Sequence, residues 1–200
     1  ACISDRKPAS AVDYSLLVNP FIGTDFTGNT YPGAQAPFGM VQLSPDNGLP
    51  GWDRISGYYY PDSTIAGFSH THLSGTGAGD LYDISYMPVT LPYREAEAPL
   101  GIHSKFRHSD EEASAGYYRV LLKDYNINVE LTATERCGIQ RYTFPKAQSA
   151  VFLNLKKAMN WDFTQDSHIE VVDSCTIQGY RFSDGWARGQ RVFFRTRFSK

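Results

Sequence analysis

The chain has 200 residues, of which 42% are hydrophobic and 14% aromatic, and this is enough for one domain with a packed core. Its 19 basic and 21 acidic residues give a formal net charge of −2. Because the two signs are mixed along the chain, we expect no binding of nucleic acid or of an anionic membrane. No run approaches the roughly 18 apolar residues that span a bilayer, so we expect no transmembrane segment.

Residues 1–13 are predicted to be a linker, because they contain Pro8, small residues and charges without apolar periodicity. Cys2 follows Ala1 at the start of a polar leader, as expected after signal-peptide removal at a lipoprotein cleavage site. An arbitrary start of the sequence would give the same pattern. We therefore expect a secreted, periplasmic or outer-membrane-anchored protein, with Cys2 as the candidate lipid anchor.

The remainder, residues 14–200, is predicted to be one antiparallel β-sandwich, because Gly and Pro recur too often for helices in the first part and β-patterns fill the second. The predicted strands are Met40–Ser44, Leu81–Val89, Tyr117–Lys123, Ile127–Ala133, Cys137–Phe144, Ala150–Leu155, Cys175–Phe182 and Arg191–Phe198. Val151, Phe152, Leu153 and Leu155 read as well buried. Since the last strand pattern runs almost to Lys200, we expect the domain to be incomplete at its C-terminal end.

The segment Gly57–Asp80 holds an unusual density of histidine, carboxylate, tyrosine and glycine. His70 and His72 are two residues apart, so on an extended segment both rings are predicted to face one space. The pair would be half of a metal site if Asp80, Asp83 or His103 supplied a third ligand. The alternatives are hydrogen bonds to a polyol or to loop backbone, or a purely structural role.

Paired carboxylates for acid and base work on a glycosidic bond are a second hypothesis. The available residues are Asp25, Asp53, Asp62, Asp80 and Asp83. Most are expected to be structural, since Asp25 and Asp62 sit in turn contexts. Trp52, Asp53 and Arg54 combine a stacking surface, an acceptor and a forked donor, which suits a sugar. A Trp that covers the core beside a surface ion pair explains the same three residues equally well.

Two further motifs point away from other chemistry. The G-T-G-A-G-D run at 75–80 lacks the helix and the remaining glycine of a dinucleotide fingerprint, and there is neither a phosphate-loop lysine nor a nucleophile elbow. Cys137 and Cys175 could pair in an oxidising compartment or remain two free thiols.

Several stretches closely resemble the amino-terminal domain of glycoside hydrolase family 92. These are N-P-F-I-G-T (19–24), N-T-Y-P-G-A (29–34), P-F-G-M-V-Q-L-S-P-D (37–46), S-G-Y (56–58) and G-F-S-H-T-H-L-S-G-T-G (67–77). The likeness is strong over residues 16–90 and rests on the β-pattern after Pro92. The chain departs from the family where Asp25 and Phe26 follow Gly23 and Thr24, and where Ala78 replaces a frequent cysteine.

The resemblance implies an inverting, calcium-dependent exo-α-mannosidase that removes terminal mannose from glycans. It implies a β-sandwich followed by an (α/α)6 barrel, with the active site between the two domains. The family places the catalytic carboxylates and the main calcium ligands in the barrel, so we expect neither in this chain and predict that residues 1–200 alone are inactive.

The resemblance also implies which residues form the wall of a mannose pocket. The candidate substrate contacts are Phe21, Gly23, Trp52, Arg54, His70, His72 and Asp80. The expected partners are α-mannosides and the enzyme's own helical domain. The competing hypothesis is a stand-alone carbohydrate-binding module that uses the same side chains without catalysis.

Overall fold

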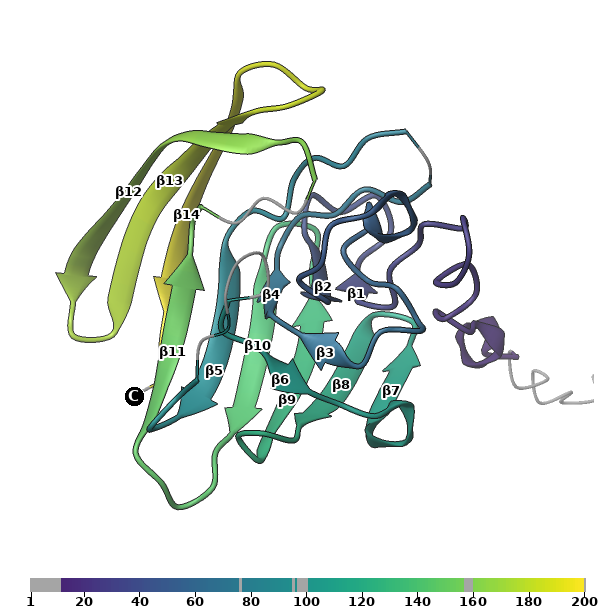
Figure 1. Cartoon of the computed structure of the whole chain (residues 1–200), viewed down its shortest axis with the longest axis horizontal. Coiled ribbons are helices and arrows are strands. Elements are labelled where there is room, and N and C mark those ends of the chain that lie inside the picture. Colours follow the sequence, from purple (N-terminus) through teal and green to yellow (C-terminus); the bar gives the residue numbers. More distant parts are fainter. Residues whose placement is uncertain (1–11, 76, 95, 97–100, 157–159, 200) are drawn as a thin grey trace, which may run out of the picture.

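The computed structural model describes residues 12–75, 77–94, 96, 101–156 and 160–199, and within them the regular structure is almost entirely β (Figure 1). Only three short 3-10 helices occur in these residues, η1 (Tyr14–Leu17), η2 (Trp52–Arg54) and η3 (His108–Asp110). The strands of the first half are β1 (Ala34–Gln35), β2 (Gln42–Asp46), β3 (Thr64–Ile65), β4 (Gly67–Ser69), β5 (Ser85–Thr90) and β6 (Ser104–Lys105). Those of the second half are β7 (Glu111–Ser114), β8 (Tyr117–Leu122), β9 (Ile127–Ala133), β10 (Gly138–Thr143), β11 (Ser149–Asn154), β12 (Phe163–Asp173), β13 (Thr176–Asp184) and β14 (Gln190–Arg197).

Two sheets enclose the main core. A five-stranded sheet has the order β1-β2-β4-β5-β11, and a four-stranded sheet has the order β10-β9-β8-β7. Leu43, Phe68 and Val89 of the first sheet pack in one cluster with Val120 and Val129 of the second. All pairings are antiparallel, so the predicted antiparallel β-sandwich is confirmed.

A third sheet, β12-β13-β14, forms a further layer beside β11 and β5 (Figure 1). Val192 and Phe194 of β14 pack on a second apolar cluster built from Ile84, Tyr86 and Leu155. The Tyr86 and Thr196 hydroxyls add a hydrogen bond of 2.6 Å. The five-stranded sheet therefore packs against the four-stranded sheet in one cluster and against the third sheet in another.

Most predicted strands of the second half are confirmed to within one or two residues. The eleven-residue strand β12 was not predicted. The prediction that Leu81–Val89 is one strand is wrong at its start, because Leu81, Tyr82 and Ile84 have φ angles of +86°, +64° and +55°, which a β-strand excludes.

The expectation that residues 151–153 are well buried is also wrong, because they are only half-buried in β11, the last strand of its sheet.

The predicted linker lies mostly outside the described residues, as does Cys2. Cys137 and Cys175 are both free thiols. Among the residues that the structure describes, none belongs to a helix with the length and apolarity needed to cross a membrane.

Candidate functional site

Four loops that are far apart in the sequence meet at one edge of the fold, and we call them together the tryptophan edge. They comprise residues 51–54, 79–83, 160–162 and 185–187, and they carry the three tryptophans of the chain. Trp52, Trp161 and Trp186 are 54%, 41% and 75% exposed. Tryptophan is normally well buried on average, so three exposed rings in neighbouring loops indicate a binding surface.

Trp52 and Trp161 form a stacked pair, with ring centroids 6.2 Å apart and an interplanar angle of 26°. Their loops are joined through Asn160, whose side-chain oxygen accepts a 3.1 Å hydrogen bond from the Gly51 amide. The Asn160 amide group donates to the Tyr82 hydroxyl at 3.4 Å. The hydrogen bonds of Asn160 therefore hold the loops of the stacked pair in one arrangement.

Asp80 connects the loop 79–83, which we call the glycine-rich loop, to the turn between β13 and β14. Its buried carboxylate accepts hydrogen bonds from the backbone N–H groups of Trp186, at 3.1 Å, and Ala187, at 2.7 Å. A Cβ on Gly185 would lie 2.6 Å from the Asp80 Oδ1 atom, so only glycine allows this approach. Gly79 is equally close to Asn160, which places the glycine-rich loop between the second and third tryptophan loops.

A buried ion-pair cluster lies at the base of this edge. The guanidinium of Arg181, on β13, donates to Asp83 Oδ1 at 2.5 Å and to both Asp162 oxygens at 2.9 and 3.0 Å. All three side chains are almost fully buried. Burial raises the pKa of Asp162, with Arg181 opposing that shift. Burial lowers the pKa of Arg181, but its contacts with Asp162 and Asp83 outweigh this and the net shift is upward. Because Asp162 follows Trp161, the cluster fixes the tryptophan loop.

Arg54 lies beside Trp52 but is already occupied by protein groups. Its Nε and Nη2 atoms donate to the Asp62 carboxylate at 2.7 and 2.6 Å, and its Nη1 atom donates to Asp53 at 3.1 Å. The guanidinium also lies 4.5 Å from the centre of the Tyr59 ring. The hydrogen bond with Asp62 is the main cause that raises the pKa of Arg54. A sugar hydroxyl at this point would share a charged network that is already formed.

His70 and His72 do not face one space, which corrects the geometric prediction. His70 lies just beyond the end of β4, with its Nδ1 atom 2.8 Å from the Ile84 carbonyl oxygen and its ring edge-on to Tyr86. Burial lowers its pKa. The fully buried His72 ring lies with Nε2 2.9 Å from Asp46 Oδ1 and Nδ1 2.7 Å from the Gln42 carbonyl oxygen. The His72 ring lies edge-on to Tyr82 and the His70 amide donates to the Asp83 carbonyl oxygen, so both histidines contact the loop 79–83. A contact with sugar stays a prediction for both.

Phe21 and Gly23 lie in a turn that packs against the aromatic loop 58–60. The Phe21 ring packs 6.0 Å from Tyr60 and 6.4 Å from Tyr58. Gly23 has a φ of +85°, and its carbonyl oxygen accepts from the Thr30 amide at 3.2 Å. Their sugar contacts are likewise untested, and their observed role is to hold this turn against the aromatic loop 58–60.

The resemblance implies a calcium ion, and carboxylates are the side chains that would hold it. Among the described residues no group of three His, Cys, Asp or Glu side chains could hold a metal ion. The carboxylates at this edge are engaged by Arg54, by Arg181 or by backbone N–H groups. The described part of the chain therefore does not fit a calcium site, and the metal hypothesis for His70 and His72 has no support there.

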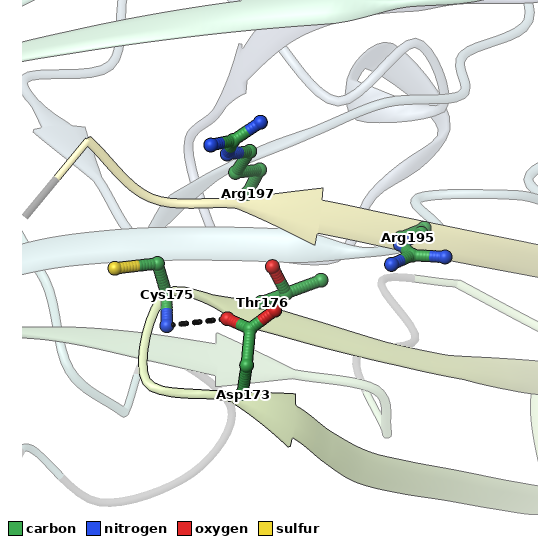
Figure 2. A pocket seen from close by; sticks show the side chains of 5 residues that line it. All are labelled: Asp173, Cys175, Thr176, Arg195 and Arg197. Atoms are coloured by element: carbon green, nitrogen blue, oxygen red, sulfur yellow. Dashed lines mark hydrogen bonds between the residues drawn. The ribbon is translucent and has the colours of Figure 1, made fainter.

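A separate hollow lies at the opposite end of β13 (Figure 2). Its lining residues are Asp173, Cys175, Thr176, Arg195 and Arg197. The Asp173 carboxylate accepts from the Cys175 amide at 2.8 Å, and this hydrogen bond is the main cause that lowers the pKa of Asp173. Since β13 spans nine residues, this hollow is about 26 Å along the strand from the turn that carries Trp186. It holds no aromatic side chain and is not part of the tryptophan edge.

Sequence reasoning missed Asn160, Trp161, Trp186 and Arg181. A local signal was present for the tryptophans, because all three occur in similar short motifs. These are G-W-D at 51–53, N-W-D at 160–162 and D-G-W at 184–186. Each tryptophan adjoins a turn-forming residue and lies within two residues of an aspartate. No comparable signal marked Arg181, which reads as an ordinary polar position in a strand.

The fold and this edge define an antiparallel β-sandwich domain that presents aromatic side chains on its loops. The sequence profile of the glycosyl hydrolase family 92 N-terminal domain matches residues 17–200. The chain therefore belongs to glycosyl hydrolase family 92 and is similar to the N-terminal domain of its members.

Solved relatives support this assignment. The family GH92 α-mannosidase BT3965 from Bacteroides thetaiotaomicron is 38% identical, with a TM-score of 0.89 over 94% of this chain. That enzyme is also known in complex with mannoimidazole. The family GH92 inverting mannosidase BT2199 from the same organism is 26% identical, with a TM-score of 0.73 over 94% of this chain.

A secreted glycosidase of uncharacterised activity from Arthroderma benhamiae is 28% identical over 143 residues, which are 66% of this chain and 18% of that protein. The chain spans only 26% and 25% of the length of BT3965 and BT2199.

Proposed function

We propose that this chain forms one wall of the active site of an inverting exo-α-mannosidase, with the tryptophan edge as the surface that meets the terminal mannose. The observation that carries the proposal is the stacked Trp52–Trp161 pair beside Asn160 and Arg54. Aromatic faces pack on the apolar C–H surface of a hexose, while amide and guanidinium groups bind its hydroxyls. The similarity to solved family 92 mannosidases supports the same assignment.

The bond-breaking groups are proposed to lie in a second, helical domain of the complete enzyme. An inverting glycosidase needs a protonated carboxylic acid at the leaving oxygen and a carboxylate that activates water, about 6.5–9.5 Å apart. The carboxylates described at the tryptophan edge already serve Arg54, Arg181 or backbone amides, so we assign them to positioning. Calcium is likewise proposed to bind outside this chain. We also propose that the complete enzyme is secreted, as the Arthroderma relative is described to be.

The test is the turnover of an aryl α-mannoside by the complete enzyme that contains this chain. Trp52→Ala and His72→Ala are each expected to lower kcat/KM at least tenfold, which corresponds to about 1.4 kcal/mol. Trp52→Ala removes the proposed sugar contact directly, whereas His72→Ala removes the ring that packs on Tyr82 in the loop 79–83. Unchanged kinetics for Trp52→Ala in a correctly folded enzyme would contradict the proposal.

A stand-alone carbohydrate-binding module is the second candidate function, because the same aromatic wall would bind sugar without catalysis. The two hypotheses differ in what purified residues 1–200 and the complete polypeptide do. We expect no mannose release from the 200-residue chain and release from the longer enzyme. Release by the 200 residues alone would place the catalytic groups in this chain and overturn our assignment.

A further inference from the structure

We propose that the third sheet binds a second copy of this chain, so that the protein forms a symmetric dimer through β12, β13 and β14 (Figure 1). One face of this sheet is covered, because Val192 and Phe194 of β14 pack on the cluster of Ile84, Tyr86 and Leu155. Alternate residues of the three strands lie on the opposite face, which we call the outer face. The inference concerns the outer face alone and does not depend on the proposed function.

The strand register defines the outer face row by row, because opposite residues of paired antiparallel strands lie on the same side of a sheet. Taken in the order β12, β13, β14, the four rows are Asp173, Thr176 and Arg197; Glu170, Gln178 and Arg195; His168, Tyr180 and Phe193; and Asp166, Phe182 and Arg191. Every β12 and β14 residue in these rows is exposed. Figure 2 shows one end of this face, with the first row and Arg195. The outer face is therefore open to a partner over all four rows.

The charges of the outer face are sorted by strand. Strand β12 contributes three carboxylates, and β14 contributes three guanidinium groups. The two strands lie on either side of β13, about 9.5 Å apart. Within the part of the chain that the structure describes, none of these six side chains takes part in an ion pair. The chain thus presents an acidic strand and a basic strand side by side, and a partner with the reverse order would pair with both.

An aromatic cluster lies between the two charged strands. The rings of Tyr180 and Phe182 are stacked, with centroids 4.3 Å apart and an interplanar angle of 21°. The Phe193 ring lies 6.0 Å from Tyr180 and 5.6 Å from Phe182, and Phe193 is nevertheless 70% exposed. An apolar centre of aromatic residues inside a charged rim is the usual anatomy of a protein–protein interface.

A second copy of the chain matches this pattern in one orientation. A two-fold axis parallel to β13 places β12 of one copy over β14 of the other and keeps each row at its own height. Asp166 then faces Arg191 of the second copy, and Glu170 faces its Arg195. A two-fold axis across the strands would instead oppose β12 with β12, and like charges would meet. The charge pattern therefore selects a single self-complementary dimer.

The size of the outer face sets the expected affinity. Residues 176–182 span about 20 Å along β13, and three strands are about 14 Å wide. This is smaller than the roughly 800 Å² that each partner buries in a standard interface. We therefore expect a weak dimer, with a dissociation constant on the order of 10 μM.

Sedimentation velocity of the complete enzyme measures this association. The dimer fraction should rise with protein concentration. It should fall when salt is added, because the Debye length decreases from about 10 Å at 0.1 M salt to about 3 Å at 1 M. Phe193→Ala should raise the dissociation constant about tenfold. A complete enzyme that remains monomeric at about 100 μM, well above the expected constant, would overturn the proposal.

A charge exchange between β12 and β14 tests the geometry. Arg191→Glu/Arg195→Glu makes both strands acidic, and Asp166→Lys/Glu170→Lys makes both basic, so each variant alone should dimerise at least about tenfold more weakly. An equal mixture of the two variants should form a mixed dimer with nearly the parent affinity, because each acidic strand again faces a basic one. Asp173 stays unchanged, since it accepts from the Cys175 amide. No recovery in the mixture would overturn the proposed arrangement.

Arg119→Glu/Arg141→Glu is the matched control, because it changes the net charge by the same amount on the four-stranded sheet. The side chains of Arg119 and Arg141 are 48% and 70% exposed, and this variant should leave the dissociation constant unchanged. Far-UV circular dichroism like that of the parent should show that each variant is folded.

Two results would assign the outer face to another occupant. If the 200-residue chain dimerises and the complete enzyme does not, another part of the same polypeptide covers this face. If the complete enzyme dimerises and the charge variants have no effect, a different surface forms the dimer. Either result would overturn the proposal.

Discussion

Replacement of Arg181 by methionine tests whether the buried ion-pair cluster stabilises the tryptophan edge. Arg181 lies on β13, and its partners Asp83 and Asp162 come from the loops before β5 and β12. The side chains of Arg181, Asp83 and Asp162 are 0%, 0% and 2% exposed. Methionine fills much of the volume but leaves two buried carboxylates without their cation. Removal of one partner from such a pair costs about 3–5 kcal/mol.

The structure refines this magnitude. Asp83 keeps two donors, the Thr71 hydroxyl at 2.7 Å and the Gln190 amide at 2.7 Å. Asp162 depends mainly on Arg181, and burial already raises its pKa. In the variant this carboxyl would take up a proton more readily, which limits the loss. We therefore expect about 3 kcal/mol near neutral pH, and a fall in Tm of roughly 6–12 °C for a domain of this size.

The assay is urea unfolding followed by fluorescence, together with calorimetry. Arg119→Met is the matched control, because Arg119 pairs with Glu112 where the side chains are 48% and 57% exposed, and such pairs contribute at most about 1 kcal/mol. The deficit of Arg181→Met relative to the parent should shrink as the pH is lowered, because burial raises the pKa of Asp162 and this carboxyl becomes neutral more readily once Arg181 is gone. A loss below about 1 kcal/mol, or a deficit that does not depend on pH, would refute the reasoning.

Two further predictions concern the buried His70 and the glycine of the N-T-Y-P-G-A motif. Since burial lowers the pKa of His70 from 6.5, the unfolded chain takes up a proton first as the pH falls below 6.5, and stability should decline by up to about 1.4 kcal/mol per pH unit. His70→Asn should give a shallower decline in urea titrations between pH 5 and pH 7, and an identical slope would contradict the assignment. A Cβ on Gly33 would lie 2.2 Å from the Leu43 carbonyl oxygen, so Gly33→Ala should cost about 1–3 kcal/mol. Gly39→Ala, whose Cβ would have a nearest contact of 3.1 Å, should cost less, and equal losses for the two variants would argue against the close approach.

The strands that could be predicted are those with one dry and one wet face. In Ile127–Ala133 the buried residues alternate with less buried ones, so the period of two is visible in the sequence. In Phe163–Asp173 no residue is buried, two are half-buried and the others are exposed. That strand is defined by its pairing with β13, which leaves no hydrophobic period to detect. The prediction of a strand over Leu81–Ile84 was wrong for the opposite reason. Its apolar and tyrosine residues suit a strand, but Leu81, Tyr82 and Ile84 have positive φ angles, which the sequence pattern does not reveal.

The candidate site was predicted in part. Of the dense segment 57–80, residues 79 and 80 belong to the tryptophan edge, while Tyr58, Ile65 and Phe68 lie in the main core. The whole G-W-D-R motif belongs to the edge, so Trp52, Arg54 and Asp80 are brought into neighbouring loops. The partners that complete the edge come from positions more than a hundred residues away, as with Asp80 and Trp186. Only the sheet topology, with β13 and β14 packed beside β5, brings them together. A single sequence without covariation contains no record of that proximity.

The central claim is that the stacked Trp52–Trp161 pair contacts the terminal mannose. The most direct measurement is a crystal structure of the complete enzyme with a mannose mimic and calcium. The account predicts ring carbons of the mimic within about 4 Å of Trp52 or Trp161, with the calcium ligands supplied by another domain. A mimic bound elsewhere, with both tryptophans sealed under protein side chains, would contradict it.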